Sequence, residues 1–155
     1  MSINVLTLIL HVLSVVIWVG GMFFAYMCLR PVAASQLEPP VRLQLWVGVF
    51  GKFFPFVWIA VILLPLTGYM MISNIYGGMG NAPLYIHIMN GLGSLMIFVY
   101  LHVFFAPYQP LKRAVAAQDW PAGGKALAQI RMLVGINTML GLLTAVIASG
   151  GRFFG

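Results

Sequence analysis

Four long apolar stretches without charged residues alternate with polar segments along the chain, and they cover residues 5–28, 53–75, 83–107 and 132–150. A helix needs ~20 apolar residues to cross the hydrocarbon core of a bilayer. Because lipid offers the backbone no hydrogen-bond partner, we expect each stretch to form a transmembrane helix. The pattern therefore predicts an all-α integral membrane protein, in which residues 1–155 form one antiparallel bundle of four transmembrane helices.

The composition supports this class of protein. Charged residues make up 6% of the chain and apolar residues 62%, whereas soluble domains carry roughly 25% charged residues. A chain with so few charged groups cannot cover its surface for water, which excludes a soluble globular protein. The lipid bilayer is thus the first partner that the sequence predicts.

Seven of the eight basic residues fall in or beside the first and third connections: Arg30, Arg42, Lys52, Lys112, Arg113, Lys125 and Arg131. Basic residues mark cytoplasmic loops, so we expect both termini to be periplasmic and the protein to lie in a bacterial inner (plasma) membrane. The same rule makes 108–131 a cytoplasmic connection, either two short amphipathic segments on the interface or a mobile loop. The basic residues follow membrane topology, so no nucleic-acid partner is predicted.

Three of the predicted helices carry stripes of polar and small residues at helical spacing. The stripe on the first helix contains His11 and Trp18. The stripe on the third helix contains His87, Asn90 and Gly91, and the stripe on the fourth contains Asn137. Small and polar residues mediate helix packing in lipid. These faces should therefore look into the bundle, where an ionisable side chain indicates function.

His11 and His87 are predicted to lie ~12 Å and ~8 Å below the outer surface, at 1.5 Å per residue. Two imidazoles at similar depth suit the axial positions of haem b, and Gly20, Gly21 and Gly91 would let the flat ring approach the backbone. His102 lies ~22 Å further along its helix, too far to share this site. The alternative for His11 and His87 is that each forms hydrogen bonds between helices, whereas His102 is expected to be an interfacial histidine or part of a second haem or substrate site.

Four methionines gather near the predicted outer end of the bundle: Met70, Met71, Met79 and Met89. Thioethers are soft ligands that suit Cu(I), although methionine is also common as apolar filling. His87-Ile88-Met89 could act as a copper motif only if the helix starts after His87, since residues two apart on a helix do not share a face.

The first helix, with His11, Trp18 and Gly20-Gly21, resembles the opening helix of the CopD-like membrane proteins and of the HemJ-type protoporphyrinogen oxidases. Residues 53–55, 66–69 and 131–141 also resemble the CopD-like pattern. The resemblance implies copper handling in the first case, and haem binding with protoporphyrinogen oxidation in the second. His87 stands where the oxidases carry lysine, and no Asn-Glu pair follows Arg131, which departs from the oxidase pattern.

Together these observations predict a haem b protein with a redox or electron-transfer role, its haem held between the first and third helices. A quinone or another redox partner would then exchange electrons with it, and an oxidoreductase activity stays open. The alternatives are a copper-binding or copper-transport protein of the CopD type, and a structural subunit of a larger membrane complex. A homo-oligomer is compatible with each alternative.

Overall fold

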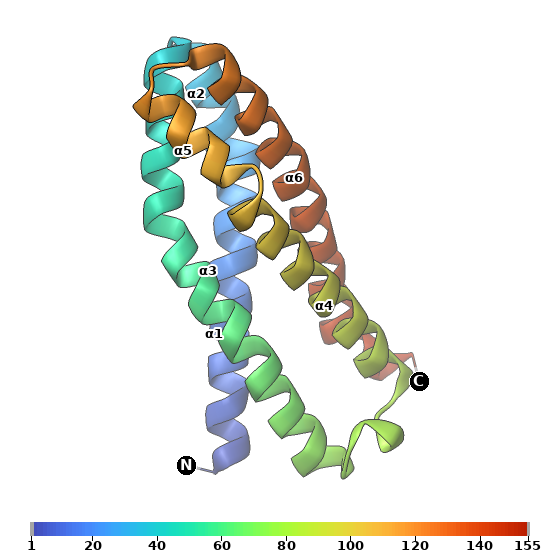
Figure 1. Ribbon diagram of the computed structural model, residues 1–155. Helices are drawn as coiled ribbons and strands as arrows, with labels where there is room; N and C mark the ends of the chain where they lie inside the picture. The colour runs from blue at the N-terminus through green and yellow to red at the C-terminus, as the bar shows by residue number, and fades with distance from the viewer. Residues whose placement is uncertain (1, 155) are drawn as a thin grey trace.

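The computed structural model describes residues 2–154, and all the secondary structure in this range is helical (Figure 1). It contains four helical segments long and apolar enough to cross a membrane: Ile3–Gln36, Pro39–Tyr76, Leu84–Ala116 and Trp120–Phe153. The predicted class, an all-α membrane protein with four spanning helices, is confirmed. Large apolar side chains cover the outside of the bundle, where Val16, Ile62 and Met139 are at least 60% exposed. This surface suits contact with lipid.

The segments divide into regular helices joined by short turns. Their bounds are α1 Ile3–Phe24, the π-helical turn η1 Ala25–Leu29, α2 Arg30–Gln36, α3 Pro39–Tyr76, the 3₁₀ turn η2 Met79–Asn81, α4 Leu84–Phe105, α5 Tyr108–Ala116, α6 Trp120–Gly150 and the 3₁₀ turn η3 Gly151–Phe153.

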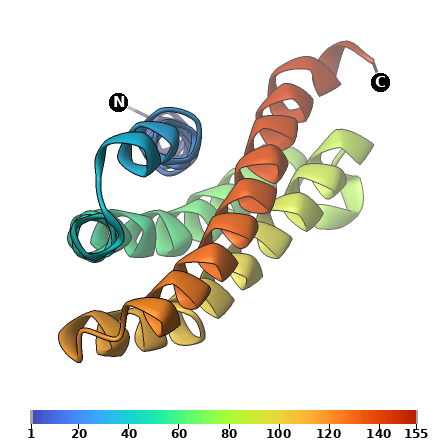
Figure 2. The same cartoon turned by 90° about the horizontal axis from the view of Figure 1, so that it is seen from above.

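The bundle consists of two packed pairs of helices. α1 lies mainly against α3, and α4 lies mainly against α6. Figure 2 shows α6 running along α4, with α1 beside the first part of α3. Both chain ends lie at one end of the bundle, while α2 and α5 lie at the other (Figure 1). We call these the terminal end and the basic end. The second name reflects the charge, because seven of the eight Lys and Arg residues lie on α2, on α5 and on the parts of α3 and α6 nearer that end.

The helices extend further at the basic end than the apolar stretches predicted. α3 begins at Pro39 and not at 53, and α6 begins at Trp120 and not at 132. At 1.5 Å per residue, the 38 residues of α3 form a helix ~57 Å long, well beyond the ~30 Å hydrocarbon core. Apolar runs predict the part of a helix in lipid, whereas the polar extensions are stabilised by packing against one another.

The connection predicted over 108–131 is also different. It contains α5 and the first turns of α6, and α5 packs on the bundle with Leu111 completely buried. Two helical segments are thus present, as one of the two alternatives predicted, but the second is continuous with the spanning part of α6. The alternative of a mobile loop is wrong, and the position of α5 at the membrane interface stays a prediction. The turn between the two helices is short, and Gln118 adopts a φ of 56° there.

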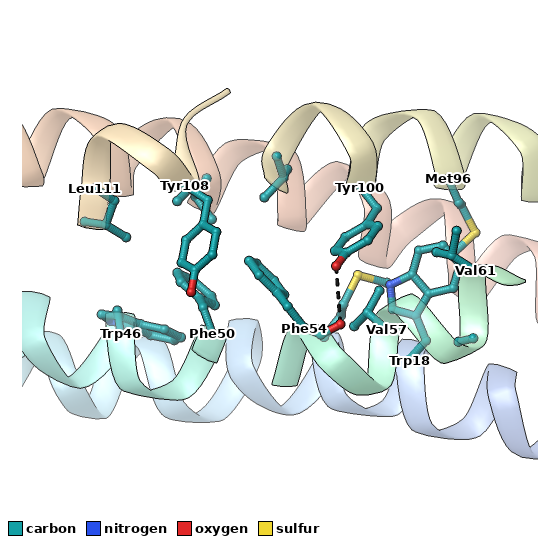
Figure 3. Packing of buried hydrophobic residues seen from close by; sticks show 14 of the residues in the cluster. Trp18, Trp46, Phe50, Phe54, Val57, Val61, Met96, Tyr100, Tyr108 and Leu111 are labelled. Atoms are coloured by element: carbon teal, nitrogen blue, oxygen red, sulfur yellow. Dashed lines mark hydrogen bonds between the residues drawn. The ribbon is translucent and has the colours of Figure 1, made fainter. Parts of the chain in front are cut away.

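Aromatic rings link α3 to α4 and α5 near the basic end. Phe50 and Phe54 stack with centroids 5.0 Å apart, and the Tyr108 ring stands edge-on to Phe54 at 4.8 Å. The Tyr100 hydroxyl donates to the Phe54 carbonyl at 3.3 Å (Figure 3). We call this set the aromatic cluster: Trp46, Phe50, Phe54, Trp58, Tyr100, Phe104 and Tyr108. Ring pairs of this geometry add ~0.5–1.5 kcal/mol each beyond area burial.

Candidate functional site

His11 on α1 contacts Thr67 on α3. Its Nδ1 lies 2.8 Å from Thr67 Oγ1, and Thr67 is almost completely buried, with 2% exposed. The two residues meet because α1 and α3 are antiparallel: His11 lies ~12 Å from the start of α1 and Thr67 ~14 Å from the end of α3. The inward orientation of His11 agrees with the predicted stripe. Its partner Thr67 is not among the site residues predicted from the sequence.

The hydrogen bonds of Thr67 favour one of the two neutral tautomers of His11. The Thr67 hydroxyl donates to the Leu63 carbonyl at 2.6 Å. A hydroxyl has one proton to donate, so when Thr67 donates to this carbonyl, its Oγ1 accepts the hydrogen bond from His11 Nδ1–H. The neutral imidazole then keeps a free lone pair on Nε2. A histidine held by a hydrogen bond at one nitrogen and free at the other has the arrangement of a metal ligand.

Gly68 provides room for the imidazole. A Cβ at this position would lie 3.3 Å from His11 Cε1, closer than ordinary van der Waals contact. Thr67 and Gly68 therefore act together, since one holds the ring by a hydrogen bond and the other leaves space beside it. The neighbouring pair explains why a polar and a small residue adjoin each other at this depth in an apolar helix.

Two thioethers are buried further along the bundle interior. Met22 and Met96 are 4% and 3% exposed, and Met22 lies three helical turns after His11 on the same face of α1. Trp18 lies between these levels, and its ring stands edge-on to Tyr100 with centroids 6.2 Å apart (Figure 3). Thr144 Oγ1 lies 3.9 Å from the sulfur of Met96. Neither methionine is among the ligands predicted from the sequence.

The other predicted haem residues have different surroundings. His87 is exposed on α4, as is His102, and Asn90 is half-buried. A Cβ on Gly20 or Gly91 would meet nothing within 4 Å, whereas Gly21 is filled by the ring of Phe53. Of the three glycines expected to let haem approach the backbone, Gly20 and Gly91 thus border open space, and Gly21 borders the ring of Phe53. The pairing of His11 with His87 through a haem stays a prediction.

The four methionines of the predicted copper site are half-buried. Met70 and Met71 lie near the end of α3, Met79 lies in η2, and Met89 lies on α4. These elements meet at the terminal end, as expected. Because α4 begins at Leu84, His87 and Met89 are both helical and point to different faces, so the local His-x-Met motif is excluded. The four-methionine site itself stays a prediction.

Residues 2–154 contain no group of three or more His, Cys, Asp or Glu side chains placed to hold a metal. The fold and the interior define a polytopic membrane protein whose inward soft donors are imidazole and thioether. Residues 47–150 match the family model described as "Copper resistance protein D", and the chain belongs to this family. The match confirms the CopD-like resemblance and covers most of α3 and all of α4, α5 and α6. Neither the curated proteins nor the solved structures gave a match.

Proposed function

We propose that this protein binds Cu(I) in the membrane and passes it between the two sides, with His11 Nε2 as the central ligand. The observation that carries the proposal is the hydrogen bond between His11 Nδ1 and Thr67 Oγ1, which leaves Nε2 free for a metal. Membership of the copper resistance protein D family supports copper as the metal. Imidazole and thioether are donors that Cu(I) accepts readily.

The arrangement of the donors suits passage and not storage. His11 lies in the half of α1 nearer the terminal end, and the buried Met22 and Met96 lie deeper in the bundle. All three side chains are neutral, so each complex keeps the positive charge of Cu(I), which is costly in a membrane. Conduction requires sites that bind strongly enough to accept an ion and weakly enough to release it. The four methionines at the terminal end would supply Cu(I) to His11.

Haem b with a redox role is the second candidate, because the same free Nε2 could coordinate haem iron. A quinone could then serve as the electron partner. Copper is preferred, since the buried metal donors that share the interior with His11 are thioethers, while His87 is exposed on α4. The two candidates differ in colour, because a haem protein has an intense Soret band and a Cu(I) complex with these ligands has none.

The test measures copper in the purified protein after loading with Cu(I) under ascorbate and washing with a Cu(I) chelator. The unaltered protein should retain copper and show no Soret band. His11→Ala should lose the metal, while the matched control His102→Ala should keep it, because His102 is exposed and distant from His11. Proteoliposomes should then take up Cu(I) in a His11-dependent manner.

Two outcomes would contradict the proposal. Equal copper retention by His11→Ala and His102→Ala would remove His11 from the site. A stoichiometric Soret band that disappears in His11→Ala, without retained copper, would establish the haem candidate. In that case, loss of the low-spin spectrum in His87→Ala would identify the second axial ligand.

A further inference from the structure

A cavity of about 240 Å³ lies at the basic end, between the end of the first spanning segment and the beginnings of α3 and α6. A single water needs only ~10–15 Å³ of such space, so the cavity admits a much larger group. Its lining combines three cationic side chains with four aromatic ones: Arg30, Arg42, Arg131, Tyr26, Trp46, Phe50 and Trp120. It is separate from His11, which lies toward the other end of the bundle.

The cationic charge of the lining has no anionic counterpart within the cavity. None of the lining residues is Asp or Glu, and the chain has only two acidic residues, Glu38 and Asp119. The Asp119 carboxylate accepts a hydrogen bond from the Ala122 amide at 3.2 Å, as the cap of α6. Three guanidinium groups around one space therefore favour an anion supplied from outside the protein.

Two of the arginines are held in place and keep free donors. Arg30 Nε donates to the Tyr26 carbonyl at 3.1 Å, and its guanidinium lies 4.5 Å from the centre of the Tyr26 ring. Arg42 Nη1 donates to the Ala34 carbonyl at 3.3 Å. Each guanidinium has five N–H groups, so most of them stay available. Their planar arrangement matches the oxygens of a phosphate group.

The π-helical turn η1 places Tyr26 and Arg30 at the cavity. The Arg30 amide donates to the Ala25 carbonyl, five residues earlier, so this turn contains one residue more than an α-helical turn. The extra residue rotates the following positions by ~100° relative to a continuous α-helix. Gly135 on α6 makes room for the Tyr26 ring, since a Cβ there would lie 2.8 Å from Tyr26 Cε2. Such turns are frequent at functional sites.

We propose that this cavity binds the headgroup phosphate of an anionic phospholipid. Arg30 and Arg131 lie just beyond the ends of the first and fourth apolar stretches, at the level where headgroups meet the protein. Anionic lipids attract basic clusters at this level, and Trp and Tyr rings occupy the same zone. Inorganic phosphate shares the charge, but the aromatic walls favour a ligand with an apolar body. This inference does not depend on the copper proposal.

The experiment titrates dioleoylphosphatidylglycerol or dioleoylphosphatidylcholine into the full-length protein in detergent and counts bound lipids by native mass spectrometry. Phosphatidylglycerol should bind in preference to phosphatidylcholine. Arg42→Gln and Arg131→Gln should each weaken its binding by roughly tenfold, as expected for the loss of one charge-assisted hydrogen-bonded pair. Arg113→Gln is the matched control, because Arg113 is exposed on α5 and does not line the cavity.

Arg131→Lys provides a variant that keeps the charge, and it should retain part of the affinity even if Arg131→Gln is poorly folded. Millimolar inorganic phosphate and glycerol 1-phosphate serve as competitors. If either displaces phosphatidylglycerol completely, the cavity is a site for a soluble anion and the lipid assignment is wrong. An equal effect of Arg113→Gln and Arg131→Gln, or equal binding of the two lipids, would also overturn the proposal.

Discussion

The Asn137 side chain joins α6 to the main chain of α4, because its Nδ2 donates to the Met96 carbonyl at 3.2 Å. Asn137 is 3% exposed, and its Oδ1 is buried without a hydrogen-bond partner among the described residues. The Nδ2 group of the amide thus links two helices, while its Oδ1 has no hydrogen bond within the described residues. The residue belongs to the polar stripe predicted for the fourth helix, and the structure confirms its inward orientation.

We expect Asn137→Ala to destabilise the bundle only modestly. Hydrogen bonds between membrane helices contribute ~0.6 kcal/mol on average and up to ~1.7 kcal/mol, and the loss of the unsatisfied Oδ1 offsets part of this value. Unfolding in mixed dodecyl maltoside and SDS micelles measures the change. Ser149→Ala is the control, because Ser149 is exposed and bonds only within its own helix. A loss above ~3 kcal/mol would show that the amide does more than link the helices.

Thr67→Val should lower the Cu(I) affinity without unfolding the protein. Valine keeps the shape of threonine but removes the acceptor for His11 Nδ1–H, so the imidazole loses its orientation. Changes in such supporting residues typically cost 10–100-fold in metal affinity. Competition with a Cu(I) chelator measures the effect, and Thr67→Ser should restore most of the affinity. An unchanged affinity in Thr67→Val would separate the hydrogen bond from metal binding.

Gly141 and Gly20 should respond in opposite ways to substitution by alanine. A Cβ on Gly141 would lie 2.8 Å from Val19 Cγ2 and 3.1 Å from Met96 Cε, whereas Gly20 has open space around it. We expect Gly141→Ala to destabilise the bundle by ~1–3 kcal/mol through overpacking. Gly20→Ala should be neutral or stabilising by up to ~1 kcal/mol, because alanine favours helix. Mixed-micelle unfolding of both variants tests the contrast.

The orientation in the membrane is predicted from the basic residues and can be tested by cysteine labelling. In a Cys28→Ser background, Gly80→Cys should react with an impermeant maleimide added outside spheroplasts, because the terminal end is expected to be periplasmic. Ala117→Cys, in the turn between α5 and α6, should react only after permeabilisation. Both positions are exposed. The opposite labelling pattern would place the arginine-lined cavity on the periplasmic side.

The sequence predicted the class of fold and the inward faces of the first and fourth spanning helices better than the ends of the helices. The charge-free runs located the four membrane segments, since lipid imposes a simple requirement on length and polarity. The extension of α3 back to Pro39 depends instead on tertiary packing, in which Leu43 and Trp46 are buried. Such packing leaves no long apolar run in the sequence.

The candidate site was predicted in part for a related reason. Helical spacing correctly turned His11 inward, but the choice of Thr67 as its partner follows from the pairing of α1 with α3, which periodicity does not reveal. His87 begins an equally regular stripe of small residues, yet it is exposed on α4. A stripe of small residues marks a helix face at which two backbones can approach each other. The residue at the start of such a stripe, here His87, can still lie outside the helix–helix contact.

The position of the aromatic cluster has a consequence for motion. Its rings on α3, from Trp46 to Trp58, lie between the basic end and the middle of the helix. We expect the interlocked rings to resist sliding there, so a relative rotation of the two helix pairs would pivot at the aromatic cluster. The displacement of the helices would grow with distance from this pivot and would therefore be greatest at the terminal end. This rotation of the helix pairs would open the approach to His11, while the arginine-lined cavity would keep its shape.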